Sequence, residues 1–328
     1  MMHNYQFQTI QMEHVSALSQ LFLERQILEK EIFPFLNNER LQIEHIESIF
    51  MNLFLQNQIL GVCVFQGDTM MGYLFAQVME SSKGHMAWVP YEGLALKQDK
   101  SLELIRLLYT KASELWVNAS CLIHSTLVPL GNSVYLEAFI RLSFAIEHVH
   151  GVLDLHEYQP YSIQNSVLIR KATREDQEAL GKLSGVVARY QNNAPVYLSI
   201  SDEQLLKRKQ AFEALVDEED VDVFVAQEYQ TIVGFSILEA STPSLMTPDQ
   251  SIELVLSGVT PQTRGQGIGK MLLNQSVLEC QNRHLRYLIT DWKITNLVAS
   301  QFWPKAGFQP ITYRLTRRID SEYKKVSE

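Results

Sequence analysis

The stretch GVTPQTRGQGIGKMLL, residues 258–273, is the most informative part of the 328-residue chain. An apolar strand pattern, SIELVLSGVT, leads into it, and a helix pattern, GKMLLNQSVLECQNR, follows. The glycines between them tolerate positive φ and let a ligand approach the backbone closely. The first amides of the helix have no partner inside it and lie at the positive end of its dipole. The stretch therefore predicts a turn that binds a diphosphate.

Two other kinds of phosphate-binding loop use the same physics. A dinucleotide loop has the spacing GxGxxG inside a βαβ unit, and this loop has neither feature, although Asp291 follows Gly269 at the distance of a ribose-binding carboxylate. A P-loop is excluded because no Gly-Lys-Ser/Thr is present. A nucleotide-dependent oxidoreductase is thus a rival class, which NAD binding without CoA binding would support.

The chain also repeats itself, with a nearly constant offset of about 162 residues. The matching pairs are 5–18 with 167–180, Gly72 with Gly234, and 132–144 with 296–308. Each pair keeps its order, and the last pair begins with Asn and ends with Phe in both copies. We predict two copies of one fold, residues 1–160 and 161–328, joined by a polar segment around Pro160. The alternative is two unrelated α/β domains.

The composition is that of a globular protein, with 46% hydrophobic and 20% charged residues. The formal net charge is −9 and no Lys/Arg-rich block occurs, which argues against nucleic-acid binding and suits a cationic substrate. The three cysteines lack zinc-site spacing, so no metal is expected. The sequence has no apolar run of the about 18 residues that a membrane span needs, and no signal-peptide pattern. We expect a cytoplasmic protein, monomeric or homodimeric, with no membrane or nucleic-acid partner.

The second half predicts a mixed α/β sheet domain. Helix patterns occupy 173–190 and 202–218, with Thr173 and Asp176 spaced as a capping box. A β-hairpin over 222–240, the strand before the glycine-rich turn, and a final strand from Phe308 complete the order β-α-α-β-β-β-α-β-α-β. We therefore predict the fold class α/β, with two tandem mixed-sheet domains and flanking helices.

The glycine-rich turn and a later helix together resemble the GNAT superfamily of acetyl-CoA-dependent N-acetyltransferases. The family signature Q/R-x-x-G-x-G/A is filled by Arg264, Gly267 and Gly269. A second family element, N-x-x-A-x-x-F/L-Y-x-x-x-G-F, is matched from Asn296 to Phe308, with Trp in place of its Tyr. The resemblance covers about residues 160–320 and implies two GNAT-like domains in tandem, similar in layout to mycothiol synthase.

The resemblance implies acetyl-CoA as the cosubstrate and assigns its contacts. Loop amides would hold the diphosphate, and the strand end at Val259 and the helix from Asn296 would flank the pantetheine arm. The implied cofactor-binding residues are Val259, Arg264, Gly265, Gln266, Gly267, Ile268, Gly269, Lys270, Asn296 and Trp303.

Three further positions bear on the chemistry of transfer. Glu253 lies 11 residues before Arg264, where the histone-acetyltransferase branch of the family has its catalytic glutamate. Apolar neighbours would raise its pKa, so we predict a general base; the alternative is a solvated Glu at a strand start. Trp303 has no acidic hydroxyl, so the leaving thiolate would be protonated by water or by another residue such as Tyr313, or would leave without protonation.

The polar stretch ARYQNNAPVYLS, residues 188–199, corresponds to a region where the family places substrate loops. Tyr190 and Tyr197 stand near its ends and are predicted to line the acceptor site. The acceptor itself, a small-molecule or peptide amine, is left open by the sequence.

The first half lacks the features of a cofactor loop. Its counterpart, LALKQDKSLELIRLL at 94–108, contains no glycine, and Asp99 would repel a phosphate. We predict that this half kept the fold and lost the cofactor; the alternative is an unusual ligand pocket. The whole chain is thus predicted to be an N-acetyltransferase that works by direct attack of an amine on the thioester. The alternative is a non-catalytic CoA-binding or regulatory protein. Release of CoA in the presence of candidate amines would distinguish the enzyme from this alternative.

Overall fold

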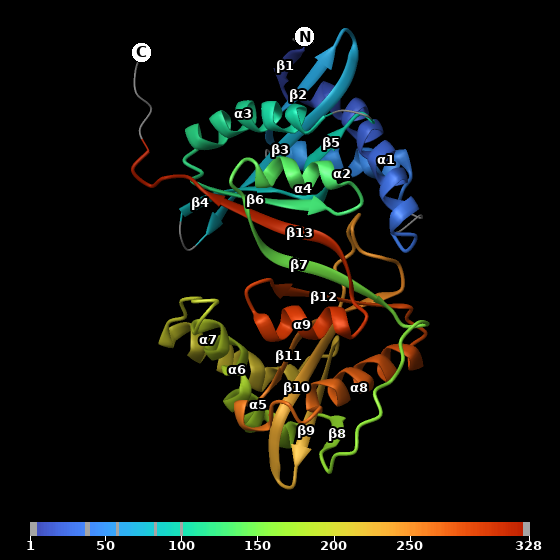
Figure 1. Cartoon of the computed structure of the whole chain (residues 1–328), viewed down its shortest axis with the longest axis vertical. Coiled ribbons are helices and arrows are strands. Elements are labelled where there is room, and N and C mark those ends of the chain that lie inside the picture. The colour runs from blue at the N-terminus through green and yellow to red at the C-terminus, as the bar shows by residue number, and fades with distance from the viewer. Residues whose placement is uncertain (1–4, 37–39, 57–58, 82–83, 99–100, 324–328) are drawn as a thin grey trace. The chain divides into compact units, whose positions relative to one another are not determined.

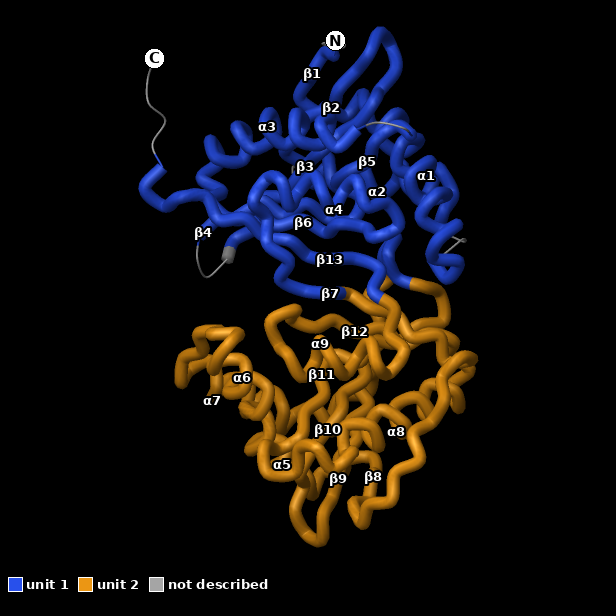
Figure 2. The backbone as a smooth tube through the Cα atoms, in the orientation of Figure 1, with its two compact units in different colours: residues 1–149, 244–247, 310–328 blue, residues 150–243, 248–309 orange. Residues whose placement is uncertain are grey.

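The computed structural model describes residues 5–36, 40–56, 59–81, 84–98 and 101–323. The chain divides into two compact units, which Figure 2 shows in different colours. Unit 1 comprises residues 1–149, 244–247 and 310–328, and unit 2 comprises 150–243 and 248–309. Figure 1 labels the helices and strands of both units. Among the described residues, no helix is long and apolar enough to cross a membrane.

Unit 1 is a mixed sheet between two pairs of helices. Its strands lie in the order β1-β2-β3-β4-β6-β13, with β5 paired to β3, and only β4 and β6 among these pairs run parallel. The strands are β1 (Gln6–Thr9), β2 (Leu60–Gln66), β3 (Thr69–Ser81), β4 (Gly84–Val89), β5 (Leu94–Leu96), β6 (Ile123–Pro129) and β13 (Gln309–Arg318). The helices are α1 (Val15–Ile32), α2 (Ile43–Leu55), α3 (Leu102–Asn118) and α4 (Ser133–Ile140).

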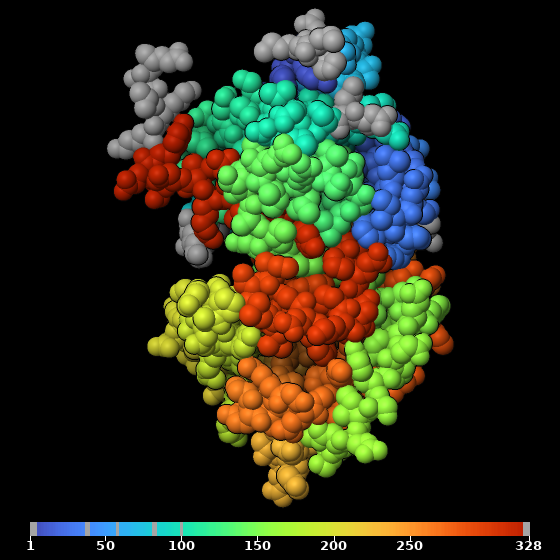
Figure 3. Space-filling model, in the orientation of Figure 1, coloured from blue at the N-terminus to red at the C-terminus, as the bar shows by residue number. Residues whose placement is uncertain are grey.

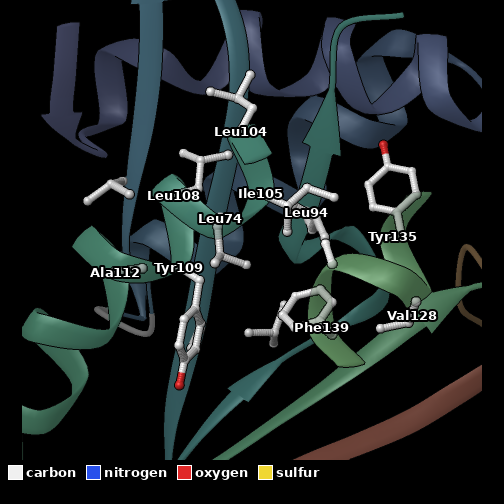
Figure 4. Close-up of a cluster of buried hydrophobic side chains, with 14 of the residues drawn as sticks. Leu74, Leu94, Leu104, Ile105, Leu108, Tyr109, Ala112, Val128, Tyr135 and Phe139 are labelled. Carbon is white, nitrogen blue, oxygen red and sulfur yellow. The ribbon is translucent and has the colours of Figure 1, made fainter. Parts of the chain in front are cut away.

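Alternation along β3 divides the core of unit 1 between the two faces of the sheet. Tyr73 and Phe75 pack with α1 and α2, whereas Leu74 packs with α3 and α4. Figure 4 shows the second cluster, in which Leu104 and Phe139 lie on the same side as Leu74. Burial of apolar side chains on both faces accounts for a sheet covered by helices on each side.

Unit 2 has the strand order β8-β9-β10-β11-β12, in which only the β11–β12 pair is parallel. The strands are β8 (Leu168–Lys171), β9 (Val221–Glu228), β10 (Thr231–Ala240), β11 (Ser251–Val259) and β12 (Tyr287–Lys293), and β7 (Ala145–Asp154) contributes its second half. The helices are α5 (Gln177–Leu183), α6 (Val186–Asn192), α7 (Asp202–Ala214), α8 (Ile268–Asn282) and α9 (Leu297–Lys305). Helices α5 and α7 cover one face, and α8 packs against the other.

The helix expected over 173–190 is interrupted. The capping box of Thr173 and Asp176 is present, but α5 ends at Leu183 and α6 begins at Val186. Between them, the hydroxyl of Ser184 donates to the carbonyl of Gly181, and Gly185 adds a residue of low helix propensity. The predicted hairpin is formed by β9 and β10.

The division into units differs from the boundary expected after residue 160. Strand β13, expected to complete the second domain, pairs with β6 of unit 1 from Thr312 to Arg318. Residues 244–247 also belong to unit 1, where Leu245 is buried and its carbonyl accepts from Gln26. The side-chain pattern of a strand shows which face is buried but does not show which strand it pairs with. The sequence therefore did not predict that β13 pairs with β6.

We expect Leu315→Ala in the full chain to lower the free energy of unfolding of unit 1 by about 2–5 kcal/mol, because Leu315 is fully buried in the core that α3 and α4 cover. Val298→Ala is the matched control, since Val298 is 56% exposed and its loss should change stability little. Urea denaturation measures both. Residues 1–160 alone would lack β13, and their purification as a cooperatively folded monomer would contradict this assignment.

Candidate functional site

The glycine-rich turn lies between β11 and α8 in unit 2. Gly265 and Gly267 have φ angles of +81° and +85°, a region that other residues enter only with strain. Gly267 is the N-cap of α8, and its carbonyl accepts from the amides of Lys270 and Met271. The backbone conformation therefore explains why glycine occupies these two positions, as expected from the sequence.

The amides of the turn are available to a ligand. Within the described part of the chain, the amides of Gly265, Gln266 and Gly267 donate no hydrogen bond. A Cβ at Gly265 would meet no atom within 4 Å, so the space beside it is open. Unpartnered amides at a helix N-terminus suit a diphosphate, and the residues present thus fit the diphosphate of acetyl-CoA.

Strands β11 and β12 diverge next to this turn. They pair in parallel over Ser251–Glu253 and Tyr287–Ile289, whereas β11 continues to Val259 and β12 to Lys293. The hydroxyl of Thr290 donates to the carbonyl of Leu254 at the start of the divergence, at 2.8 Å. The register of β11 against β10 also shifts here, as in a β-bulge. The result is an open strand edge that leads toward the glycine-rich turn.

Val259 presents its backbone to this open edge. The amide of Thr260 donates to Val233 of β10, so by alternation the polar groups of Val259 point the other way. The Nε of Arg264 donates to the carbonyl of Val259 at 3.3 Å. The amide of Val259 is positioned to donate to an extended ligand such as a pantetheine arm.

Arg264 and Tyr190 are brought together by the fold. The guanidinium carbon of Arg264 lies 4.8 Å from the centroid of the Tyr190 ring, a cation–π distance. Tyr197 is 75% exposed and lies apart from these contacts in the described structure. Tyr190 therefore borders the glycine-rich turn, while the roles of Tyr190 and Tyr197 in acceptor binding stay predictions.

The two predicted residues on α9 have structural tasks. The side chain of Asn296 caps α9 by accepting from the amide of Ala299, as Asn132 caps α4 by accepting from Val134. The ring of Trp303 is 8% exposed and packs edge-to-face against its aromatic neighbours. Contact of either residue with a cofactor stays a prediction. Phe302, which fills the F/L position of the second family element, is the ring nearest to a Cβ built at Gly269.

Glu253 lies among carboxylates. It is directly opposite Glu239 on β10, and Asp291 on β12 shares the same sheet face by alternation. Burial, followed by the negative charges of Asp291 and Glu239, raises the pKa of Glu253 above its usual value. A carboxyl group with a raised pKa is a suitable general base, and the surrounding charge suits a cationic amine. The sequence does not assign Glu239 or Asp291 to this cluster, because only the strand register places them beside Glu253.

Tyr313 belongs to the other unit of the chain. It lies on β13 in unit 1, where it pairs with Val128 of β6. The described residues of unit 2 thus contain neither Tyr313 nor a tyrosine at the position of Trp303.

In unit 1, strand β5 is the counterpart of the end of β11, and its free edge is covered by side chains of unit 1 itself. Leu96 pairs with Gly72 as Val259 pairs with Gly234, which makes Leu96 the counterpart of Val259. The amide of Leu96 donates to the hydroxyl of Tyr135 at 3.2 Å, and Arg25 donates to the carbonyl of Leu94.

Arg25 fills the space beside this edge. It is 3% exposed and lies 4.6 Å from the Phe22 ring centroid and 4.5 Å from that of Tyr91. The filled edge supports the prediction that unit 1 holds no cofactor. Asp99, which that prediction invoked, lies outside the described residues.

Comparison with known proteins agrees with this geometry. Residues 219–310 match the family model of the acetyltransferase (GNAT) domain. A search of curated proteins finds no match. A GCN5-related N-acetyltransferase from Sphaerobacter thermophilus is similar in structure over 96% of this chain and 95% of its own, with a TM-score of 0.60 and 13% identity.

Two further structures are similar over 96% of this chain. One is a GCN5-related glucosamine N-acetyltransferase region of a fungal multi-domain β-N-acetylglucosaminidase, with 38% of that chain covered, 15% identity and a TM-score of 0.54. The other is a tandem GNAT protein from the clavulanic acid biosynthesis pathway, with 98% covered, 14% identity and a TM-score of 0.49.

The family match coincides with the glycine-rich turn and the diverging strands, and the first of these structures is similar along nearly the whole length of both chains. Residues 219–310 are thus similar to the GNAT acetyltransferase domain, and the sheet of unit 1 repeats part of its design, because Gly72 pairs with Leu96 as Gly234 pairs with Val259.

Proposed function

We propose that unit 2 transfers an acetyl group from acetyl-CoA to an amine. The observation that carries the proposal is the open edge of β11, which ends at a turn with unpartnered amides at Gly265 and Gly267. The turn binds the diphosphate, and the amide of Val259 hydrogen-bonds the pantetheine arm. This extended arrangement leads the thioester along the open edge toward Glu253 on the same strand.

The chemistry requires one displacement and the removal of two protons from the acceptor ammonium. Glu253 accepts a proton from the acceptor ammonium, directly or through water, because its pKa is raised. The amine nitrogen then attacks the thioester carbonyl; the C–N bond forms, the C–S bond breaks, and CoA leaves as a thiolate. The attacking nitrogen loses its second proton, which reaches the thiolate through water, and the proton on Glu253 is released to solvent. A strand amide next to the carbonyl would stabilise the developing oxyanion.

The experiment that tests this function is a panel of amines assayed for release of the CoA thiol. Diamines, aminosugars, amino acids and peptide N-termini are each incubated with the full chain and acetyl-CoA. We expect at least one class to release CoA in proportion to the acetylated product found by mass spectrometry. If acetyl-CoA binds but no amine releases CoA, the chain is instead a non-catalytic CoA-binding protein.

A further inference from the structure

The segment of residues 155–167, which follows β7 in unit 2, is hydrogen-bonded to α8 through the side chain of Asn274. The hydroxyl of Tyr158 donates to the side-chain carbonyl of Asn274 at 2.7 Å, and the amide of Tyr161 donates to the same oxygen at 3.0 Å. The side-chain amide of Asn274 donates in turn to the carbonyl of Tyr161 at 2.9 Å. In Figure 1 this segment runs beside α8. It is therefore an ordered part of unit 2, and it lies outside the matched family region of 219–310.

The same segment then contacts the glycine-rich turn. The side chain of Ile163 lies 3.0 Å from a Cβ built at Gly267, and the side-chain amide of Asn165 donates to the carbonyl of Gln266 at 3.1 Å. The Nζ of Lys270, in the first turn of α8, lies 4.4 Å from the centroid of the Tyr161 ring. Tyr161 is thus directly beside the residues proposed to bind the diphosphate.

A pocket opens on this segment. Its volume is about 340 Å³, at the lower end of the range for small-ligand sites. Its lining includes Asp154, Glu157, Tyr158, Tyr161, Lys305 and Gly307. The hydroxyl of Tyr161 donates to the carbonyl of Lys305 at 3.3 Å, which joins the segment to the end of α9. Arg286 pairs with Asp154 at 3.1 Å and offsets part of the negative charge of the lining.

We propose that this pocket binds the adenine ring of CoA, with Tyr161 as the stacking surface. The inference rests on the proposed function, because it takes the diphosphate to lie on the turn from Gly265 to Lys270. In CoA the adenosine directly follows the diphosphate, and Tyr161 is the aromatic ring next to Lys270. The carboxylate of Glu157 is an acceptor for the exocyclic amino group of adenine, and Lys305 supplies a positive charge for the ribose 3′-phosphate.

The test compares two acetyl donors with the same pantetheine arm, one of which lacks the adenosine end together with one phosphate of the diphosphate. Acetyl-CoA and S-acetyl-4′-phosphopantetheine are titrated into the full chain and into Tyr161→Ala and Tyr161→Phe. We expect Tyr161→Ala to weaken acetyl-CoA about tenfold, as the loss of one base–aromatic stack predicts, and to leave the truncated donor unchanged. Tyr161→Phe keeps the ring and should bind both donors as the parent does.

The outcomes separate this inference from the proposed function. Equal loss of both donors in Tyr161→Ala would show that the segment only supports the turn, and no loss of either would show that the ring does not touch the cofactor; both results overturn the adenine site alone. Failure of the parent chain to bind acetyl-CoA overturns the proposed function and this inference together. Thermal unfolding of the two variants confirms that each is folded at the assay temperature.

Discussion

Gly267→Glu is expected to weaken acetyl-CoA binding by at least about a hundredfold. The glutamate would carry a Cβ at a φ of +85°, 3.0 Å from Ile163, which costs about 1–2 kcal/mol in backbone strain alone. Its negative charge would lie against the diphosphate, and each lost hydrogen bond to a charged ligand costs about 1.5–3 kcal/mol. Isothermal titration of the full chain with acetyl-CoA measures the loss.

The matched control is Gly67→Glu. Gly67 also has a positive φ, at +60°, but lies in the turn between β2 and β3 of unit 1 with no atom within 4 Å of a built Cβ. The Gly67→Glu variant should have a similar backbone strain at the substituted position and the acetyl-CoA affinity of the parent. An unchanged affinity in Gly267→Glu would remove the assignment of the cofactor turn.

Glu253→Gln is expected to lower the rate of acetyl transfer by about 10²–10⁴-fold at neutral pH and to leave acetyl-CoA affinity unchanged. The parent should lose activity as the pH falls through the raised pKa of Glu253, because the protonated carboxyl cannot accept the proton of the ammonium. The deficit of the variant should shrink at high pH, where the free amine forms without help. Rates measured across pH with one accepted amine give both profiles.

Two controls keep this result specific. A carboxyl whose pKa is raised in the fold costs stability once the pH exceeds its folded pKa, so replacing Glu253 with Gln should not destabilise the protein at neutral pH. Trp303→Phe should leave the pH profile in place, because no proton passes through the indole. Full activity of Glu253→Gln at every pH would place the base elsewhere.

The turn at 264–270 was predictable from sequence because its physics is local. Glycines that need positive φ, followed at once by a helix start, predict the conformation of this turn without knowledge of distant contacts. The tandem repeat was also visible, and it extends to single positions: Ser143 and Gly307, which match in the repeat, both have positive φ.

What the sequence left open depends on pairing between distant strands. Glu239 and Asp291 join Glu253 only through the register of β10, β11 and β12. The placement of β13 beside β6 is likewise a choice of partner, which an alternating strand pattern does not specify. Asn132 and Asn296, by contrast, depend only on local structure. Each caps the helix that follows it, and this capping role accounts for the presence of Asn in both copies of the repeat.

We expect one unit of the two to bind acetyl-CoA. The filled edge of unit 1, where Tyr135 accepts from the amide of Leu96, and the open edge of unit 2 predict a single site. The direct measurement is the stoichiometry of acetyl-CoA binding to the full chain by isothermal titration. We predict one molecule per chain, and none for Gly267→Glu; two molecules per chain, or none for the parent, would contradict the account.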